Sequence, residues 1–118
     1  AEDSASGMSV SWSDYDRDGV MDLYVSNMFS AAGRRVTSQQ LFKPGAPALV
    51  RKRLQRFARG NTLLRGKKDG AFSDESLKAN VNMGRWAWAS SFVDLNADGW
   101  DDLVVANGYI TTEDTGDL

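Results

Sequence analysis

Two stretches of the chain carry the same pattern of aspartates. Residues 11–27 read SWSDYDRDGVMDLYVSN, and residues 91–108 read SFVDLNADGWDDLVVANG. Asp14 aligns with Asp94 at an offset of 80 residues. An internal repeat sets the architecture of a chain, so these two stretches guide the interpretation of the segments around them.

Each copy has the pattern D-x-[DN]-x-D-G-x-x-D-L, which favours a calcium loop. Oxygen-bearing side chains at positions 1, 3 and 5 converge as the chain curls, and glycine at position 6 permits the sharp turn. The carbonyl of position 7 and the acid of position 9 complete a set of hard oxygen ligands that suits Ca²⁺. The pattern predicts two sites, with the ligands Asp14, Asp16, Asp18, the Val20 carbonyl and Asp22 in the first, and Asp94, Asn96, Asp98, the Trp100 carbonyl and Asp102 in the second.

The pattern differs from an EF-hand in two respects. Position 12 of an EF-hand loop is a bidentate Glu, whereas here it is Val25 or Val105. The flanking residues are β-like, where an EF-hand has helices. The sites are therefore expected between strands, and the second should bind more weakly because Asn96 replaces an acid. Without a cation, the clustered acids would repel one another.

Hydrophobic alternation predicts an all-β chain with one inserted helix. Pro44 and Gly45 favour a loop over residues 26–45. From Ala48 to Arg59, apolar residues at helical spacing predict a helix that ends before Gly60. Strands are expected at residues 7–12, 21–25, 62–64, 71–72, 86–93 and 103–106.

The charges are strongly segregated. Residues 34–68 contain 11 basic side chains and no acid, while the rest of the chain has a balance of −13. We expect the apolar face of the helix, at Val50, Leu54 and Phe57, to lie on the sheet. The basic face would meet solvent, or it would bind a polyanion through Arg51, Lys52, Arg56 and Arg59. Nucleic acid is the less favoured partner, because no known binding module is present.

The composition excludes several classes of protein. The chain has no Cys and no His, so it lacks thiolate metal sites, disulfides and the commonest general base. No apolar run approaches the ~20 residues that a membrane-spanning helix needs. Ala1 stands where an initiator Met would be, which predicts a removed signal peptide or a piece of a longer chain.

At the level of whole segments, the chain resembles the FG-GAP (or VCBS) repeats of integrin-type β-propellers. The aspartate loops carry the resemblance, together with residues 61–74, which are similar to the hairpin N-x-L…D-G-x-F-x-D of such repeats. The run Arg85–Ser90 and the following Val105–Gly108 are similar to the ASPIC/UnbV-associated subgroup, which includes cartilage acidic protein-like proteins. The resemblance covers residues 7–28 and 60–110.

The resemblance implies about one and a half propeller blades in a single unit, residues 1–118. Residues 7–28 would be a partial blade, 30–59 a basic helical insert, 60–110 a complete blade and 111–118 an acidic tail. A closed propeller needs at least about four blades, so we expect part of a larger propeller or an oligomer; the alternative is a small two-sheet domain in which the helix covers one face. Trp86, Trp88 and Phe92 would form the core between blades or, alternatively, a carbohydrate-stacking platform.

These observations predict a calcium-binding, non-enzymatic structural and interaction module. Its partner would be another protein or further blades, in cis or in an oligomer. An extracellular, periplasmic or cell-surface location is expected, because calcium there is high enough to fill sites of modest affinity. The alternatives are a fragment of a propeller enzyme and a polyanion-binding or nucleic-acid-binding protein that uses residues 34–68.

Overall fold

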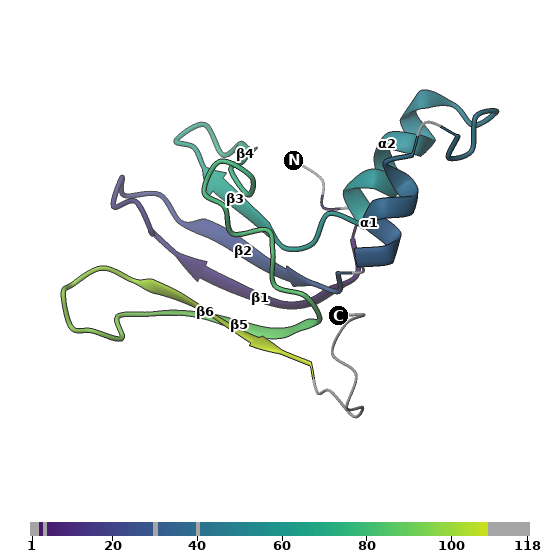
Figure 1. The fold of residues 1–118 in the computed structure, drawn as a ribbon. Coiled ribbons are helices and arrows are strands. Elements are labelled where there is room, and N and C mark those ends of the chain that lie inside the picture. Colours follow the sequence, from purple (N-terminus) through teal and green to yellow (C-terminus); the bar gives the residue numbers. More distant parts are fainter. Residues whose placement is uncertain (1–2, 4, 30, 40, 109–118) are drawn as a thin grey trace.

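The computed structural model describes residues 3, 5–29, 31–39 and 41–108, and this part of the chain is mostly β (Figure 1). The strands predicted from alternation are all present within a few residues of their expected bounds. The expected acidic tail, 111–118, lies outside the described residues. The elements are β1 (Gly7–Ser13), β2 (Asp22–Asn27), α1 (Ala31–Thr37), α2 (Ala48–Phe57), β3 (Thr62–Gly66), β4 (Phe72–Asp74), β5 (Ala87–Val93) and β6 (Asp102–Asn107).

The strands form two antiparallel sheets. The larger has the order β1-β2-β3-β4, and the smaller is the hairpin β5-β6. The resemblance implied that residues 60–110 form one complete blade, and this expectation is wrong. The hairpin β3-β4 joins β2, where Leu64 is opposite Leu23, so the complete sheet spans residues 7–74.

A buried pair of asparagines explains why β3 returns to β2. Asn27 ends β2 and Asn61 precedes β3, and both side chains are fully buried. The backbone N–H of Asn27 donates to Asn61 Oδ1 at 2.8 Å, and Asn27 Nδ2 donates to the Gly60 carbonyl at 2.9 Å. Buried amides require such partners, so the contacts fix the two ends of the insert together regardless of its length.

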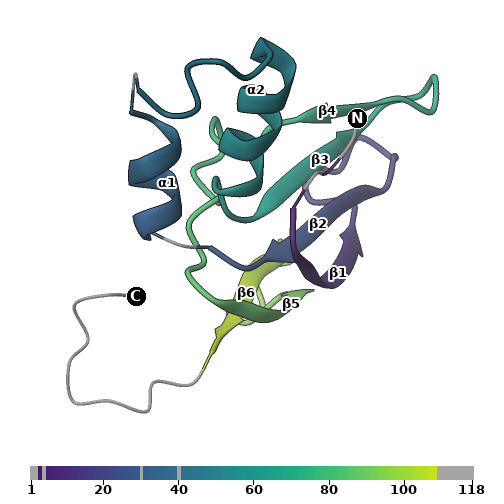
Figure 2. The same ribbon diagram turned by 90° about the vertical axis from the view of Figure 1, so that its right-hand side faces the viewer.

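The insert contains two helices where one was expected. Helix α1 lies within the predicted loop 26–45, and α2 ends at Phe57, two residues before the predicted end. Both helices lie at one end of the larger sheet (Figures 1 and 2). The prediction that the apolar face of α2 lies on the sheet is wrong: none of the ten described residues of α2 is buried, and Phe57 is 49% exposed.

Ion pairs attach α2 to the sheet instead. The guanidinium groups of Arg56 and Arg59 contact Asp74 at the end of β4, with Arg59 Nη2 at 2.5 Å from the carboxylate. Arg56 also lies 3.6 Å from Asp3. Helix α2 is therefore held by its last turn, and its apolar side chains are left without a layer of sheet to cover them.

The two sheets pack together along β5, which lies against β1 and β2. Ser90 Oγ is 2.8 Å from Ser11 Oγ, and the Phe92 and Tyr24 rings meet in a T-shaped arrangement with centroids 6.2 Å apart. Tyr24 is fully buried, and its hydroxyl donates to the Val81 carbonyl at 2.8 Å. This packing brings the turns of both repeat hairpins to the end opposite α1 and α2 (Figure 1).

Candidate metal centre

The first aspartate loop is the turn that joins β1 to β2. One carboxylate oxygen from each of Asp14, Asp16 and Asp18 lies within 4.8 Å of the other two. The two oxygens of Asp14 accept the backbone N–H groups of Asp18 and Gly19, at 2.9 Å each. Arg17 and Gly19 have φ angles of 58° and 84°, and this left-handed backbone curls the chain around the carboxylates.

Asp22, at position 9 of the pattern, closes the loop and is fully buried. Its Oδ1 accepts the backbone N–H of Gly66 at 2.8 Å, and its Oδ2 accepts that of Tyr15 at 3.1 Å. Burial raises the pKa of Asp22, and the carboxylates of Asp16 and Asp18 raise it further. The electrostatics of the loop therefore favour a positive charge among these carboxylates.

One such positive charge comes from Arg65, which was not among the predicted site residues. Arg65 Nε lies 2.5 Å from Asp16 Oδ2, and Arg65 Nη2 lies 2.8 Å from Asp18 Oδ2. The charge of Asp16 is the main cause that raises the pKa of Arg65. Sequence spacing gave no signal of this contact, since Arg65 is 47 residues from Asp18 and becomes its neighbour only through the β2–β3 pairing.

The second aspartate loop joins β5 to β6 and has the same conformation as the first. Ala97 and Gly99 have φ angles of 58° and 85°, nearly those of their counterparts. The oxygens of Asp94 accept the N–H groups of Asp98 at 3.0 Å and Gly99 at 2.7 Å. One sequence pattern has thus produced one backbone arrangement twice.

The second loop is more open than the first. Asn96 Nδ2 donates to Asp98 Oδ2 at 2.9 Å. A carboxylate oxygen of this predicted ligand therefore already accepts a hydrogen bond. Hydrogen bonds from the Trp100 N–H and from Asn96 lower the pKa of Asp98. Asp102 accepts the N–H of Leu95 at 3.2 Å and is less buried than its counterpart in the first loop.

The residues at position 7, Val20 and Trp100, each donate a backbone N–H to a carboxylate of their own loop. The N–H of Val20 donates to Asp18 Oδ1 at 3.0 Å, and the N–H of Trp100 donates to Asp98 Oδ1 at 2.8 Å. These bonds fold both residues into their loops. Metal binding through their carbonyl oxygens stays a prediction.

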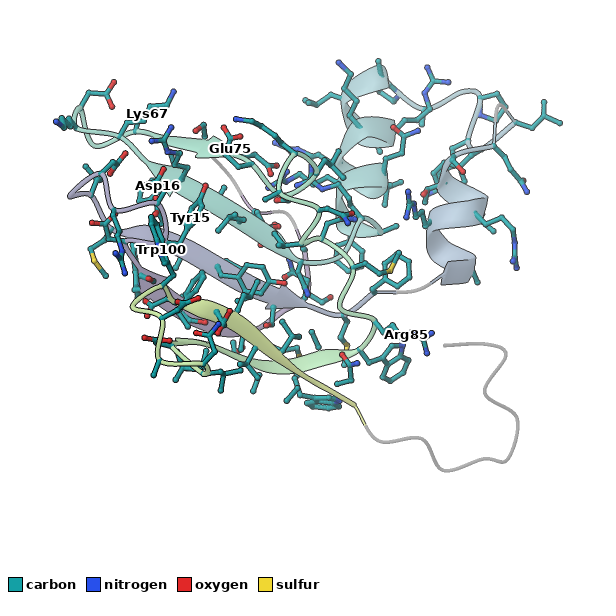
Figure 3. All side chains as sticks on the ribbon, turned by 60° about the vertical axis from the view of Figure 1, so that its left-hand side comes forward. Tyr15, Asp16, Lys67, Glu75, Arg85 and Trp100 are labelled. Atoms are coloured by element: carbon teal, nitrogen blue, oxygen red, sulfur yellow. The ribbon has the colours of Figure 1, made fainter. Side chains whose placement is uncertain are left out.

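The two loops lie side by side. The Arg17 guanidinium sits 4.0 Å from the centre of the Trp100 ring, and Ser13 Oγ donates to Asp101 Oδ2 at 2.6 Å. Figure 3 shows Asp16 and Trp100 at the same end of the molecule, far from Arg85. The structure therefore brings both predicted sets of ligands to one end, in two separate loops.

The four residues proposed for polyanion binding do not form one surface. Arg56 and Arg59 are turned toward Asp74, as described above. Arg51 and Lys52 instead line a groove of about 290 Å³ between α1 and α2. Half of the predicted anion-binding set is thus neutralised within the chain.

The predicted aromatic cluster is also divided. Phe92 is half-buried and packs against Tyr24 between the two sheets. Trp86 and Trp88 are 44% and 48% exposed.

Among the described residues, no helix is long and apolar enough to cross a membrane.

Comparison with known proteins finds one family model that matches part of the chain. Residues 54–105 match the model of an FG-GAP-like repeat. This stretch begins in α2, contains β3, β4 and β5, and includes the second aspartate loop. The match supports the repeat but not the narrower ASPIC/UnbV subgroup, and the first loop lies outside it. No curated protein and no solved structure matches the chain.

Proposed function

We propose that the chain binds two calcium ions, one in each aspartate loop, and that the ions stabilise a non-enzymatic structural and interaction module. The observation behind the proposal is that both copies of the aspartate pattern adopt the same loop conformation. Asp14 and Asp94 each accept two backbone N–H groups in the same way, and glycine follows at the same position with φ near 85°. The FG-GAP-like match over the second loop supports it.

The donor atoms of the first loop suit a hard divalent cation. Within the described part of the chain, Asp16 Oδ1 is buried and takes part in no hydrogen bond. Asp14 and Asp18 place further oxygens within 4.8 Å. Calcium takes 6–8 oxygens at about 2.3–2.6 Å, and carboxylates, the Val20 carbonyl and water would supply them.

Arg65 would compete with calcium in the first loop. Its guanidinium now neutralises Asp16 and Asp18, and an ion that binds both carboxylates would take over this role. Arg65 is 40% exposed in its side chain, so it has room to move into solvent.

The fold supports a propeller-like assembly. Strands β1 to β4 would form one blade, and β5-β6 would begin the next, since the two hairpins repeat at an offset of 80 residues. We propose an extracellular, periplasmic or cell-surface location, where calcium concentrations fill sites of modest affinity. The clustered acids are assigned to metal binding, and the chain has neither His nor Cys, so no catalytic role is proposed.

Calorimetric titration of the metal-free chain with calcium tests the proposal. Two ions should bind per chain, and Asp18→Asn or Asp98→Asn should each remove one. Asp69→Asn is the control, because Asp69 lies in the exposed turn between β3 and β4 and should leave both sites intact. The function would be disproved if the parent chain bound no calcium, or if both loop variants bound as many ions as the parent chain.

A further inference from the structure

The repeat relates the two hairpins residue by residue. Val10 pairs with Val25 as Ser90 pairs with Val105, and both hairpins shift register at the same point, between Gly7 and Ser9 or between Ala87 and Ala89. A residue on β1-β2 and the residue 80 positions later therefore occupy the same place in the same framework.

Among the described residues, the two hairpins contact each other across one interface. On the side of β5-β6, Ser90, Phe92 and Asp101 form the contact. On the side of β1-β2, their contact partners are Ser11, Tyr24 and Ser13, respectively. Ser90 lies 2.8 Å from Ser11, the Phe92 ring meets Tyr24, and Ser13 donates to Asp101 at 2.6 Å.

The repeat assigns the same contact surface to the outer face of the first hairpin. The counterparts of Ser90, Phe92 and Asp101 are Val10, Trp12 and Met21. These three apolar side chains are 56%, 53% and 51% exposed. The Trp12 ring also meets Phe72 of β4 with centroids 6.3 Å apart, but in the described part of the chain about half of each of these side chains stays exposed, on a face of the kind that β5-β6 uses for packing.

The outer face of the second hairpin is the complementary surface. Val93 and Val104 are the counterparts of Ser13 and Tyr24, and they are 40% and 38% exposed. Ala89 and Ser91, which correspond to the serines that contact Ser90, are exposed as well. The outer faces of the two hairpins therefore carry the two halves of an interface that the same hairpins form with their inner faces in the described structure.

We propose that a second copy of this chain docks head to tail, with the Val10–Trp12–Met21 face of one copy on the Val93–Val104 face of another. The repeat places Trp12 against Val104 and Met21 against Val93. Both pairs are apolar, whereas the internal Ser13–Asp101 pair is polar, so burial favours association. This inference names the partner of the proposed interaction module and does not depend on its calcium sites.

Such an interface is heterologous, because two different surfaces meet. Each added copy leaves the same two faces free at the ends, so association continues until a ring closes or a filament forms. This property distinguishes the proposal from a symmetric dimer, in which one surface meets its own copy.

Sedimentation equilibrium of the 118-residue chain over about 1–200 μM tests the inference. The mass should rise with concentration beyond that of a dimer. Trp12→Lys and Val104→Lys should each abolish association, while an equimolar mixture should form dimers and nothing larger, because each variant keeps the half that the other lacks. Phe57→Lys, an exposed substitution outside both faces, should associate like the parent chain.

Circular dichroism and melting curves show whether each variant remains folded, and a second pair, Val10→Lys with Val93→Lys, replaces any that does not. A parent chain that stays monomeric overturns the inference. The two faces would then pack against other repeats of a longer polypeptide instead of a second copy. Dimers of either single variant alone overturn the head-to-tail arrangement. Sedimentation is measured both with calcium and with chelator. Association in chelator would support this inference even if calorimetry showed that the chain binds no calcium, so the two proposals can fail separately.

Discussion

Arg65 on β3 holds Asp16 of the first aspartate loop through an ion pair of 2.5 Å between Nε and Oδ2. The same guanidinium reaches Asp18 at 2.8 Å. A side chain from the third strand thus neutralises two predicted ligands from the turn between the first two strands. The contact makes the two repeat loops electrostatically different although their backbones are alike.

Replacing Arg65 by Gln should strengthen calcium binding in the first loop. The variant removes a competing cation from Asp16 and Asp18, and partly exposed ion pairs contribute up to about 1 kcal/mol each. We expect the dissociation constant of that site to fall about two- to tenfold, as measured by calorimetry with the second loop inactivated by Asp98→Asn.

Lys67→Gln is the control for Arg65→Gln, because Lys67 is exposed just beyond the end of β3. It removes one positive charge without touching the loop. A first site that is equally weak in both variants would show that Arg65 does not compete with the metal.

Asp22 and Asp102 occupy the same position of the repeat but should differ in their contribution to folding. Asp22 is fully buried and accepts two backbone N–H groups, so Asp22→Ala leaves both unpaired and should cost about 1–3 kcal/mol in chelator. Asp102 accepts one bond from Leu95, and Asp102→Ala should cost less than about 1 kcal/mol. Urea unfolding measures both, and equal costs would refute the distinction.

The attachment of α2 to the sheet should be sensitive to acid. Burial would raise the pKa of Asp74, but hydrogen bonds from Ser76, Arg59 and Arg56 outweigh it and hold this pKa well below its ordinary value. A carboxylate with a depressed pKa stabilises the fold above its unfolded pKa, and this stabilisation is lost as the pH falls toward the folded value.

Asp74→Asn should therefore destabilise the chain by about 1–2 kcal/mol at pH 7. The gap between parent and variant should narrow as the pH falls below about 4, the ordinary pKa of Asp. Unfolding curves at pH 7 and pH 3 measure the gap, with Asp69→Asn as a control that should change little at either pH. A gap independent of pH would mean that the charge of Asp74 is unimportant.

The strands and loops could be predicted from the sequence because their signals are local. Alternation located β1, β2 and β5, and the spacing from Asp14 to Asp22 fixed the shape of the first turn through short-range N–H bonds to carboxylates. The repeat doubled this information by showing the same pattern at Asp94.

The arrangement of the strands could not be predicted in the same way. The pairing of β2 with β3 depends on Asn27 and Asn61, which are separated by the insert and become partners only when buried. Helix α1 has seven residues and contains Gly33, so its periodicity is too short to distinguish it from a loop. Arg65 is one of the 11 basic residues between positions 34 and 68, and its role depends on that same non-local pairing.

The position of bound calcium tests the central claim most directly. A crystal structure of the chain grown with calcium, with anomalous scattering recorded at long wavelength, should show two peaks per chain, one in each aspartate loop. Each ion should have oxygens at about 2.3–2.6 Å from Asp14, Asp16 and Asp18 or from Asp94, Asn96 and Asp98, and Arg65 should have left the first loop. Two ordered loops without an anomalous peak, and with Arg65 still paired to Asp16, would contradict the account.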